Sequence, residues 1–113
     1  MKTIRITFLI AMIGFFITPL QAQYTKQQAI DLVLTNILSN ELSQVDVYML
    51  DITKSNQNSI LLGDRTTINL PYSNNWVCFV NDKPFANWAH SCRYILIDEA
   101  SGNYQIVGIS YNL

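Results

Sequence analysis

The sequence is poor in charged residues and in the residue types from which most catalytic and metal sites are built. Its 113 residues include seven Lys and Arg, eight Asp and Glu, one His and two Cys. Without an excess of basic residues, the chain lacks the attraction for phosphate that supplies most nucleic-acid affinity. The same deficit disfavours binding to a membrane surface. We therefore expect no nucleic-acid partner and no membrane anchor.

Several compact functional motifs are also missing. No Ser stands in a nucleophile elbow, and no glycine-rich loop is present that could cradle a phosphate. Asp98, Glu99 and Asn103 lack the spacing that positions the oxygen ligands of a calcium loop, so we expect a solvated hairpin turn there. The sequence therefore predicts no cofactor, no metal and no catalytic residues.

The chain has no apolar run long enough to span a bilayer. Its longest such run, residues 6–17, is about a dozen residues, whereas a membrane-spanning helix needs about 20. Lys2 and Arg5 precede this run, and Pro19, Leu20, Gln21 and Ala22 follow it. This order is typical of a signal peptide at residues 1–22, cleaved after Ala22. We expect the mature protein to be secreted or periplasmic.

The expected mature chain, residues 23–113, has the length of a single small domain. Removing 22 of 113 residues leaves 91, for which about 60 to 65% of the unfolded chain's surface becomes buried. Five basic and eight acidic residues give this part a net charge near −3. We therefore expect one domain without a basic surface.

A helix is predicted to begin at Thr25. Thr25 and Gln28 have the spacing of a capping box, in which each side chain accepts a hydrogen bond from the other residue's backbone N–H. Apolar residues then recur at the three-and-four spacing of one buried stripe. The stripe consists of Ala29, Ile30, Val33, Leu34, Ile37 and Leu38. Ser39 and Asn40 are expected to end the helix.

The remainder of the chain has the composition of β-strands. We expect strands at residues 45–52, 60–62, 68–70, 76–80, 93–97 and 104–111, with residues 60–62 returning antiparallel to the first strand. Residues 101–103 indicate a hairpin turn, and the last three strands should follow one another as a meander. Because one apolar helix stripe needs one sheet face, the fold class is α+β: one N-terminal amphipathic helix packed on a mostly antiparallel sheet of four to five strands.

Two Cys in an oxidising compartment suggest a disulfide between Cys78 and Cys92. If their strands pair antiparallel about residue 85, the two thiols lie face to face. Such a bridge would close a loop of about 15 residues and contribute roughly 3 kcal/mol of stability. The same register places Trp76 opposite Tyr94 and Val80 opposite His90.

His90 lies two residues before Cys92, which leaves two chemical alternatives to the disulfide. The pair could supply a nucleophile and its base, as in a thiol-dependent enzyme. Cys78, Cys92 and His90 could instead bind zinc, with Asp82 as the fourth ligand. Neither the strand geometry of residues two apart nor the ligand spacing favours these alternatives.

The loop at residues 84–89 contains two large aromatic residues. Phe85 and Trp88 can either cap one end of the core or be presented to a partner, since aromatic side chains dominate many interface hot spots. The binding residues that we predict on and beside this loop are Phe85, Asn87, Trp88, His90 and Arg93.

The segment from Trp76 to Tyr94, with Ala-Asn-Trp-Ala-His before Cys92, Arg93 and Tyr94, resembles a segment of small secreted proteins of Bacteroidota. The layout of one helix followed by antiparallel strands is similar to that of PepSY-like and propeptide-like domains that accompany secreted peptidases. The second resemblance covers the layout alone and implies a free-standing inhibitor.

Taken as a whole, the sequence predicts a secreted, non-enzymatic binding module. Its most concrete form is an inhibitor or chaperone of a secreted protease, with the peptidase as protein partner. The alternatives are a metal- or thiol-dependent enzyme centred on His90 and Cys92, or an accessory structural domain of an envelope complex.

Overall fold

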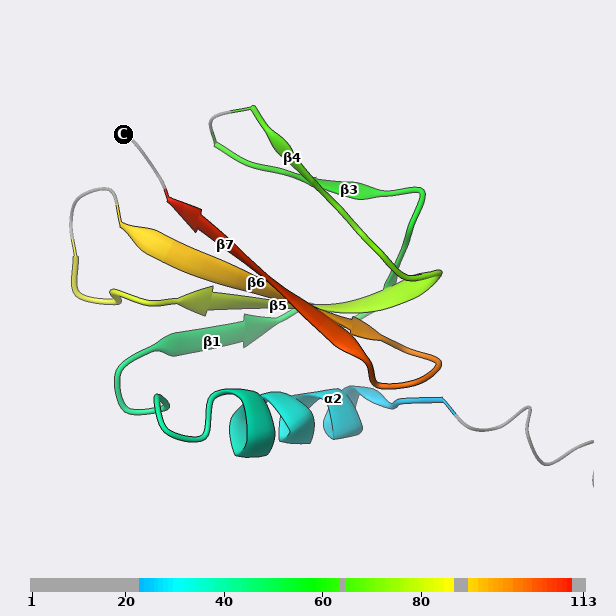
Figure 1. Ribbon diagram of the computed structural model, residues 1–113, viewed down its shortest axis with the longest axis horizontal. Helices are drawn as coiled ribbons and strands as arrows, with labels where there is room; N and C mark the ends of the chain where they lie inside the picture. The colour runs from blue at the N-terminus through cyan, green and yellow to red at the C-terminus, as the bar shows by residue number, and fades with distance from the viewer. Residues whose placement is uncertain (1–22, 64, 87–89, 111–113) are drawn as a thin grey trace, which may run out of the picture.

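The computed structural model describes residues 23–63, 65–86 and 90–110, and these ranges form an α+β fold. Within them, one short helix packs on an antiparallel sheet, and a smaller sheet lies on the opposite side (Figure 1). The expected signal peptide, residues 1–22, lies outside the described residues. Nowhere in the described ranges is a helix long and apolar enough to cross a membrane.

Helix α2 (Lys26–Leu32) begins where the sequence predicts. The Thr25 Oγ1 atom accepts a hydrogen bond from the N–H of Gln28 at 3.1 Å, and Gln28 Oε1 accepts one from the N–H of Thr25 at 2.8 Å. The predicted capping box is therefore confirmed. The helix continues as a π-helical turn, η2 (Val33–Ile37), so the predicted stripe extends through both elements.

The described strands form a five-stranded and a two-stranded sheet. In the larger sheet the order is β1-β5-β6-β7, all antiparallel, and β2 also pairs with β5. Its strands are β1 (Asp46–Met49), β2 (Lys54–Ser55), β5 (Asn74–Asn81), β6 (Ser91–Asp98) and β7 (Tyr104–Ser110). The smaller sheet consists of β3 (Ser59–Leu61) and β4 (Thr67–Asn69). The predicted meander of the last three strands is confirmed, whereas the pairing of residues 60–62 with the first strand is wrong, because β3 pairs with β4 instead.

Both faces of the central strands are buried. On the helix face, α2 and η2 cover one apolar cluster (Ala29, Val33, Leu38, Trp76, Cys78, Val80, Ile95 and Ile97). On the opposite face, which we call the β3–β4 face, a second cluster consists of Ile68, Leu70, Val77 and Leu96. Burial on both sides explains why β5 and β6 are almost continuously apolar rather than alternating.

Strands β5 and β6 pair in a register three residues away from the predicted one. Cys78 lies opposite Ile95, and Cys92 lies opposite Asn81. Because side chains alternate between the two faces of a sheet, a register shift by an odd number of residues places the two cysteines on opposite faces. Cys78 lies on the helix face and Cys92 on the β3–β4 face. No disulfide joins them, so the predicted bridge is wrong. Trp76 lies opposite Ile97 rather than Tyr94, and Val80 opposite Arg93 rather than His90.

The turn between β6 and β7 depends on Gly102. Its φ of +81° is in the left-handed region, and its N–H donates to the carbonyl of Asp98 at 2.8 Å. A Cβ atom at this position would lie 2.4 Å from the ring of Tyr24. Tyr24 in turn donates its N–H to the carbonyl of Glu99 at 2.6 Å, so the residue before α2 packs on this turn.

We expect Gly102→Ala to lower the free energy of unfolding by about 1 to 3 kcal/mol, because it strains the backbone and displaces the Tyr24 ring. Gly63→Ala is the matched control, since a Cβ there meets nothing within 4 Å and φ is not positive. Urea denaturation followed by circular dichroism measures both variants. Equal stability of the two variants would contradict the close packing of Tyr24 on the turn.

Candidate functional site

The loop between β5 and β6, which we call the Phe85 loop, presents Phe85 to solvent. This residue is 95% exposed, the highest value among the large apolar residues of the described ranges. The N–H of Ala86 donates to the carbonyl of Lys83 at 3.0 Å, which places Pro84 and Phe85 at the tip of a turn. A hollow of about 360 Å³ beside this turn is lined by Gln44, Asp82, Lys83, Pro84, Phe85 and Ala86. Phe85 therefore does not cap the core.

Arg93 braces the base of this loop on the helix face. Its Nη2 donates to Asp82 Oδ1 at 2.6 Å and to Glu41 Oε1 at 2.8 Å, and its Nε donates to Asp82 Oδ1 at 3.0 Å. The hydrogen bond to Asp82 is the main reason that the pKa of Arg93 is raised, and burial opposes this shift. The guanidinium thus joins β6, the loop and the turn after η2 in one charge-assisted network.

A second set of polar contacts holds the other side of the loop. Asn81 Oδ1 lies 2.9 Å from His90 Nε2 and accepts a hydrogen bond from the N–H of Lys83 at 3.1 Å. One amide side chain at the end of β5 therefore contacts both ends of the loop. His90 and Arg93 therefore both make polar contacts within the protein at the base of the loop, and their predicted role in binding stays a prediction.

The predicted binding residues differ in their exposure to solvent. Phe85 is presented to solvent, whereas His90 and Arg93 are half-buried at the base of the loop. Asn87 and Trp88 lie outside the described residues. Their predicted role in binding stays a prediction.

The geometry does not bring together the four ligands of the predicted zinc site. Cys78 and Cys92 are fully buried and lie on opposite faces of the sheet, and Asp82 is held by Arg93. Burial also raises the pKa of the Cys78 thiol from 9.0 to about 11. The described residues contain no group of three or more His, Cys, Asp or Glu side chains arranged to hold a metal ion.

A row of aromatic residues crosses the β3–β4 face and was not singled out from the sequence. Tyr48, Phe79 and Tyr94 are successive cross-strand neighbours on β1, β5 and β6, with ring centroids 6.2 Å and 5.1 Å apart. A hollow of about 280 Å³ lies along this row, lined by Tyr48, Met49, Leu50, Ile60, Val77, Phe79 and Tyr94. The three rings are far apart in sequence, and only the true register aligns them.

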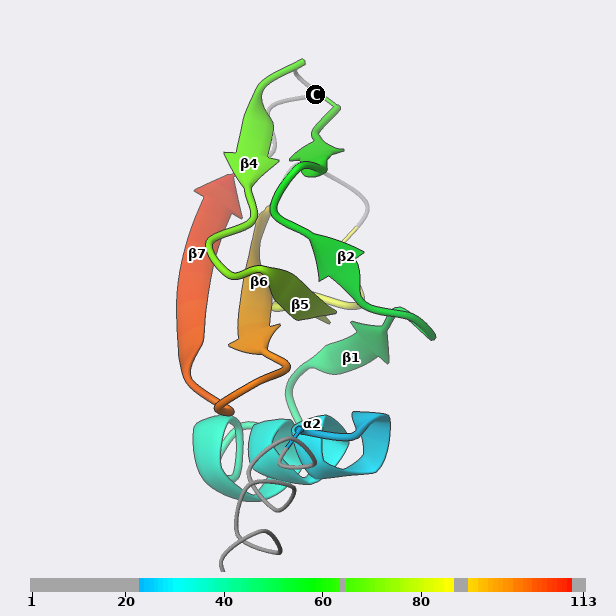
Figure 2. The ribbon, with the colours of Figure 1, turned by 90° about the vertical axis from the view of Figure 1, so that its right-hand side faces the viewer.

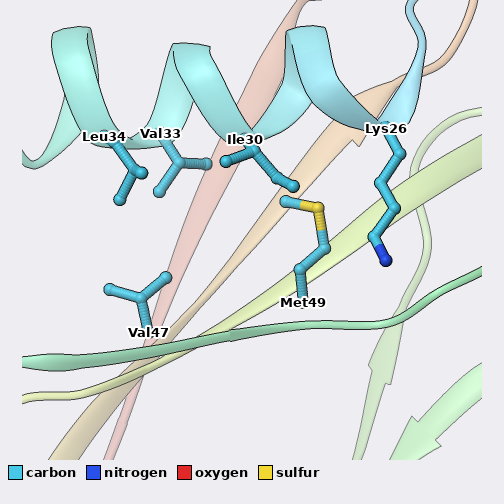
Figure 3. Close-up of a pocket in the computed structure, with 6 residues that line it drawn as sticks. All are labelled: Lys26, Ile30, Val33, Leu34, Val47 and Met49. Carbon is cyan, nitrogen blue, oxygen red and sulfur yellow. The ribbon is translucent and has the colours of Figure 1, made fainter.

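A further apolar hollow of about 290 Å³ lies between α2 and β1, lined by Lys26, Ile30, Val33, Leu34, Val47 and Met49. Figure 3 shows the aliphatic side chains of the helix facing Val47 and Met49 across this gap, with Lys26 at one end. The Lys26 amine pairs with Asp51 and lowers the pKa of that carboxyl group. Lys26 is the one polar residue in this lining, and its amine is already paired with Asp51. Since no set of polar side chains converges on the hollow, it is a weaker candidate for a binding site than the Phe85 loop.

The chain matches no family model, no curated protein and no solved structure in the three comparisons made with known proteins.

We expect Arg93→Met to lower the free energy of unfolding by about 2 kcal/mol, because Asp82 and Glu41 then lose a charged hydrogen-bond donor in a half-buried site. A double-mutant cycle with Asp82→Asn should give a clear coupling energy. The matched control is a cycle of Lys26→Met with Asp51→Asn. That exposed pair should give a smaller coupling, and equal couplings would show that Arg93 does not brace the loop.

The buried Cys78 thiol predicts a loss of stability at high pH. Its pKa is raised in the folded state, so the unfolded chain binds fewer protons between pH 9 and 11, and stability falls as pH rises through this range. The loss should reach about 2 kcal/mol. Comparing the wild type with Cys78→Val, by chemical denaturation at each pH, removes the contributions of Tyr and Lys. Identical pH profiles would contradict the expected shift.

Proposed function

We propose that this protein is a secreted, non-enzymatic binding module that captures a protein partner through the Phe85 loop, with a secreted peptidase as its most concrete partner. The observation that carries the proposal is that Phe85 is 95% exposed at the tip of a loop whose two ends are held by hydrogen bonds. Exposure of an aromatic ring to water is unfavourable in free energy, and its burial by a partner contributes about 1.5 to 3 kcal/mol of binding energy.

The polar network below the ring supports this role because it holds the two ends of the loop in place before a partner arrives. Asp82 is held by Arg93 on one side, and His90 contacts Asn81 on the other. A loop whose ends are already held loses less entropy when it binds, so more of the burial energy appears as affinity. The exposed tip and the rigid base together favour recognition over capping of the core.

Secretion is part of the proposal and is supported by the sequence of residues 1–22. Their basic start, short apolar run and small residue at position 22 have the order of a cleaved leader. A peptidase partner is supported by the resemblance in layout to domains that accompany secreted peptidases. Two alternatives stay as rival proposals: a metal- or thiol-dependent enzyme at His90 and Cys92, and an accessory structural domain.

The proposal is tested with Phe85→Ala. We measure the proteolytic activity of culture supernatant from the natural source while purified wild-type or variant chain is added. The wild type should reduce this activity, and Phe85→Ala should lose at least ten-fold in potency, because a central aromatic anchor is worth more than about 1.4 kcal/mol. The melting temperature should hardly change, since the ring makes few contacts within the protein.

Leu61→Ala is the matched control, because Leu61 is also a strongly exposed apolar residue, at 70%, but lies on β3. It should leave potency unchanged. If Phe85→Ala inhibits as well as the wild type, the loop is not the contact. If Tyr48→Ala loses potency instead, the contact lies on the aromatic row of the β3–β4 face.

A further inference from the structure

Strand β7 is an unprotected edge of the larger sheet. It pairs with β6 on one side, and in Figure 2 it forms the outer margin of the sheet, with no other described element beyond it. Natural edge strands are usually prevented from pairing with other chains by charged residues, by Pro, by bulges or by being short. The seven residues of β7, Tyr104–Ser110, contain no charged residue and no Pro. β1, at the other margin, is four residues long and begins with Asp46.

The pairing with β6 determines which backbone groups of β7 face outward. The N–H of Asp98 donates to the carbonyl of Asn103 at 2.7 Å, so this pair is hydrogen-bonded. Hydrogen-bonded and non-bonded pairs alternate along an antiparallel ladder. The backbone groups of Tyr104, Ile106, Gly108 and Ser110 therefore point away from β6 and are available to another strand.

We propose that two copies of this chain pair antiparallel through β7, about a two-fold axis at Val107. Position 107 is the midpoint of Tyr104–Ser110, so this register pairs all seven residues of both strands. Ile106 then lies opposite Gly108 of the second copy, and Tyr104 lies opposite Ser110. These are the residues whose backbone groups point outward, so the register aligns donors with acceptors.

Side chains support the same register. Ile106 is 45% exposed on the helix face, and a Cβ added at Gly108 would meet nothing within 4 Å. Cross-strand partners share a face, so Ile106 of each copy would cover the bare backbone at Gly108 of the other. Since β7 carries no charge, two copies of it do not repel each other there, and a C2 contact closes on itself without forming fibres.

The first test is the mass of the full chain in solution by light scattering, over a wide range of concentration. The wild type should approach twice the mass of a single chain. Ile106→Lys should restore the mass of a single chain, because it places a charge against the second copy. The matched control is Ile52→Lys, the same change at a residue that is 64% exposed and lies beyond β1, at the opposite margin of the sheet. It should leave the dimer intact.

The second test examines the register. With the axis at Val107, Val107→Cys places two equivalent thiols in a non-hydrogen-bonded pair about 4.5 Å apart at Cα, which suits a disulfide. Mild oxidation should therefore cross-link this variant rapidly. In Gln105→Cys the equivalent residues are offset by four positions, about 13 Å along the strand, and should cross-link far more slowly.

Each outcome decides the proposal. A wild type with the mass of one chain at every concentration overturns it, as does a dimer that Ile106→Lys leaves unchanged. Equal cross-linking of the two cysteine variants overturns the register. If the wild type is a monomer and Ile106→Lys abolishes its capture of a partner, self-pairing is overturned. The β7 edge is then assigned to pairing with an extended strand of that partner.

Discussion

The register between β5 and β6 is the constraint on which the rest of this structure depends. These two strands share seven cross-strand pairs in the centre of the larger sheet. Because side chains alternate strictly, this one register decides the face of every residue on both strands. It sends Arg93 to the helix face, where Asp82 and Glu41 lie within hydrogen-bonding distance, and it places Phe79 beside Tyr94 on the other face.

The sheet is covered on both faces by elements from the first two thirds of the chain. Helix α2 and turn η2 pack on one side, and the β3–β4 pair packs on the other. Asn75 is buried near the start of β5, and its side-chain amide is fully hydrogen-bonded. Its Nδ2 donates to the carbonyls of Lys54 and Tyr72, and its Oδ1 accepts from the N–H of Tyr72. This side chain ties β2 and the segment before β5 together without leaving a buried polar group unpaired.

The two proposed recognition surfaces, the Phe85 loop and the β7 edge, are built by different physical means. The loop offers an apolar ring on a charged and hydrogen-bonded base, so its specificity would come from a side chain fitting a pocket. The edge offers backbone donors and acceptors, so its specificity would come from the pairing of strands. Phe85 belongs to neither apolar cluster, whereas β7 packs Val107 and Ile109 against the cluster on the β3–β4 face and leaves Ile106 exposed on the other face.

Sequence alone determined the features that depend on neighbours along the chain. The capping box at Thr25, the strand character of the last three segments and the turn at Gly102 all follow from local backbone chemistry. The sequence did not show that residues 60–62 leave the main sheet, because pairing of a short strand depends on which surface is free to receive it.

Only the tertiary structure decided the β5–β6 register, and with it the separation of Cys78 from Cys92 and the alignment of three aromatic rings. The physical reason lies in the apolar character of both faces. Where one face is polar, alternation excludes a slip by an odd number of residues, but where both are buried, either parity satisfies the hydrophobic pattern. The choice then rests on packing by α2 and by the β3–β4 pair, which are distant in sequence.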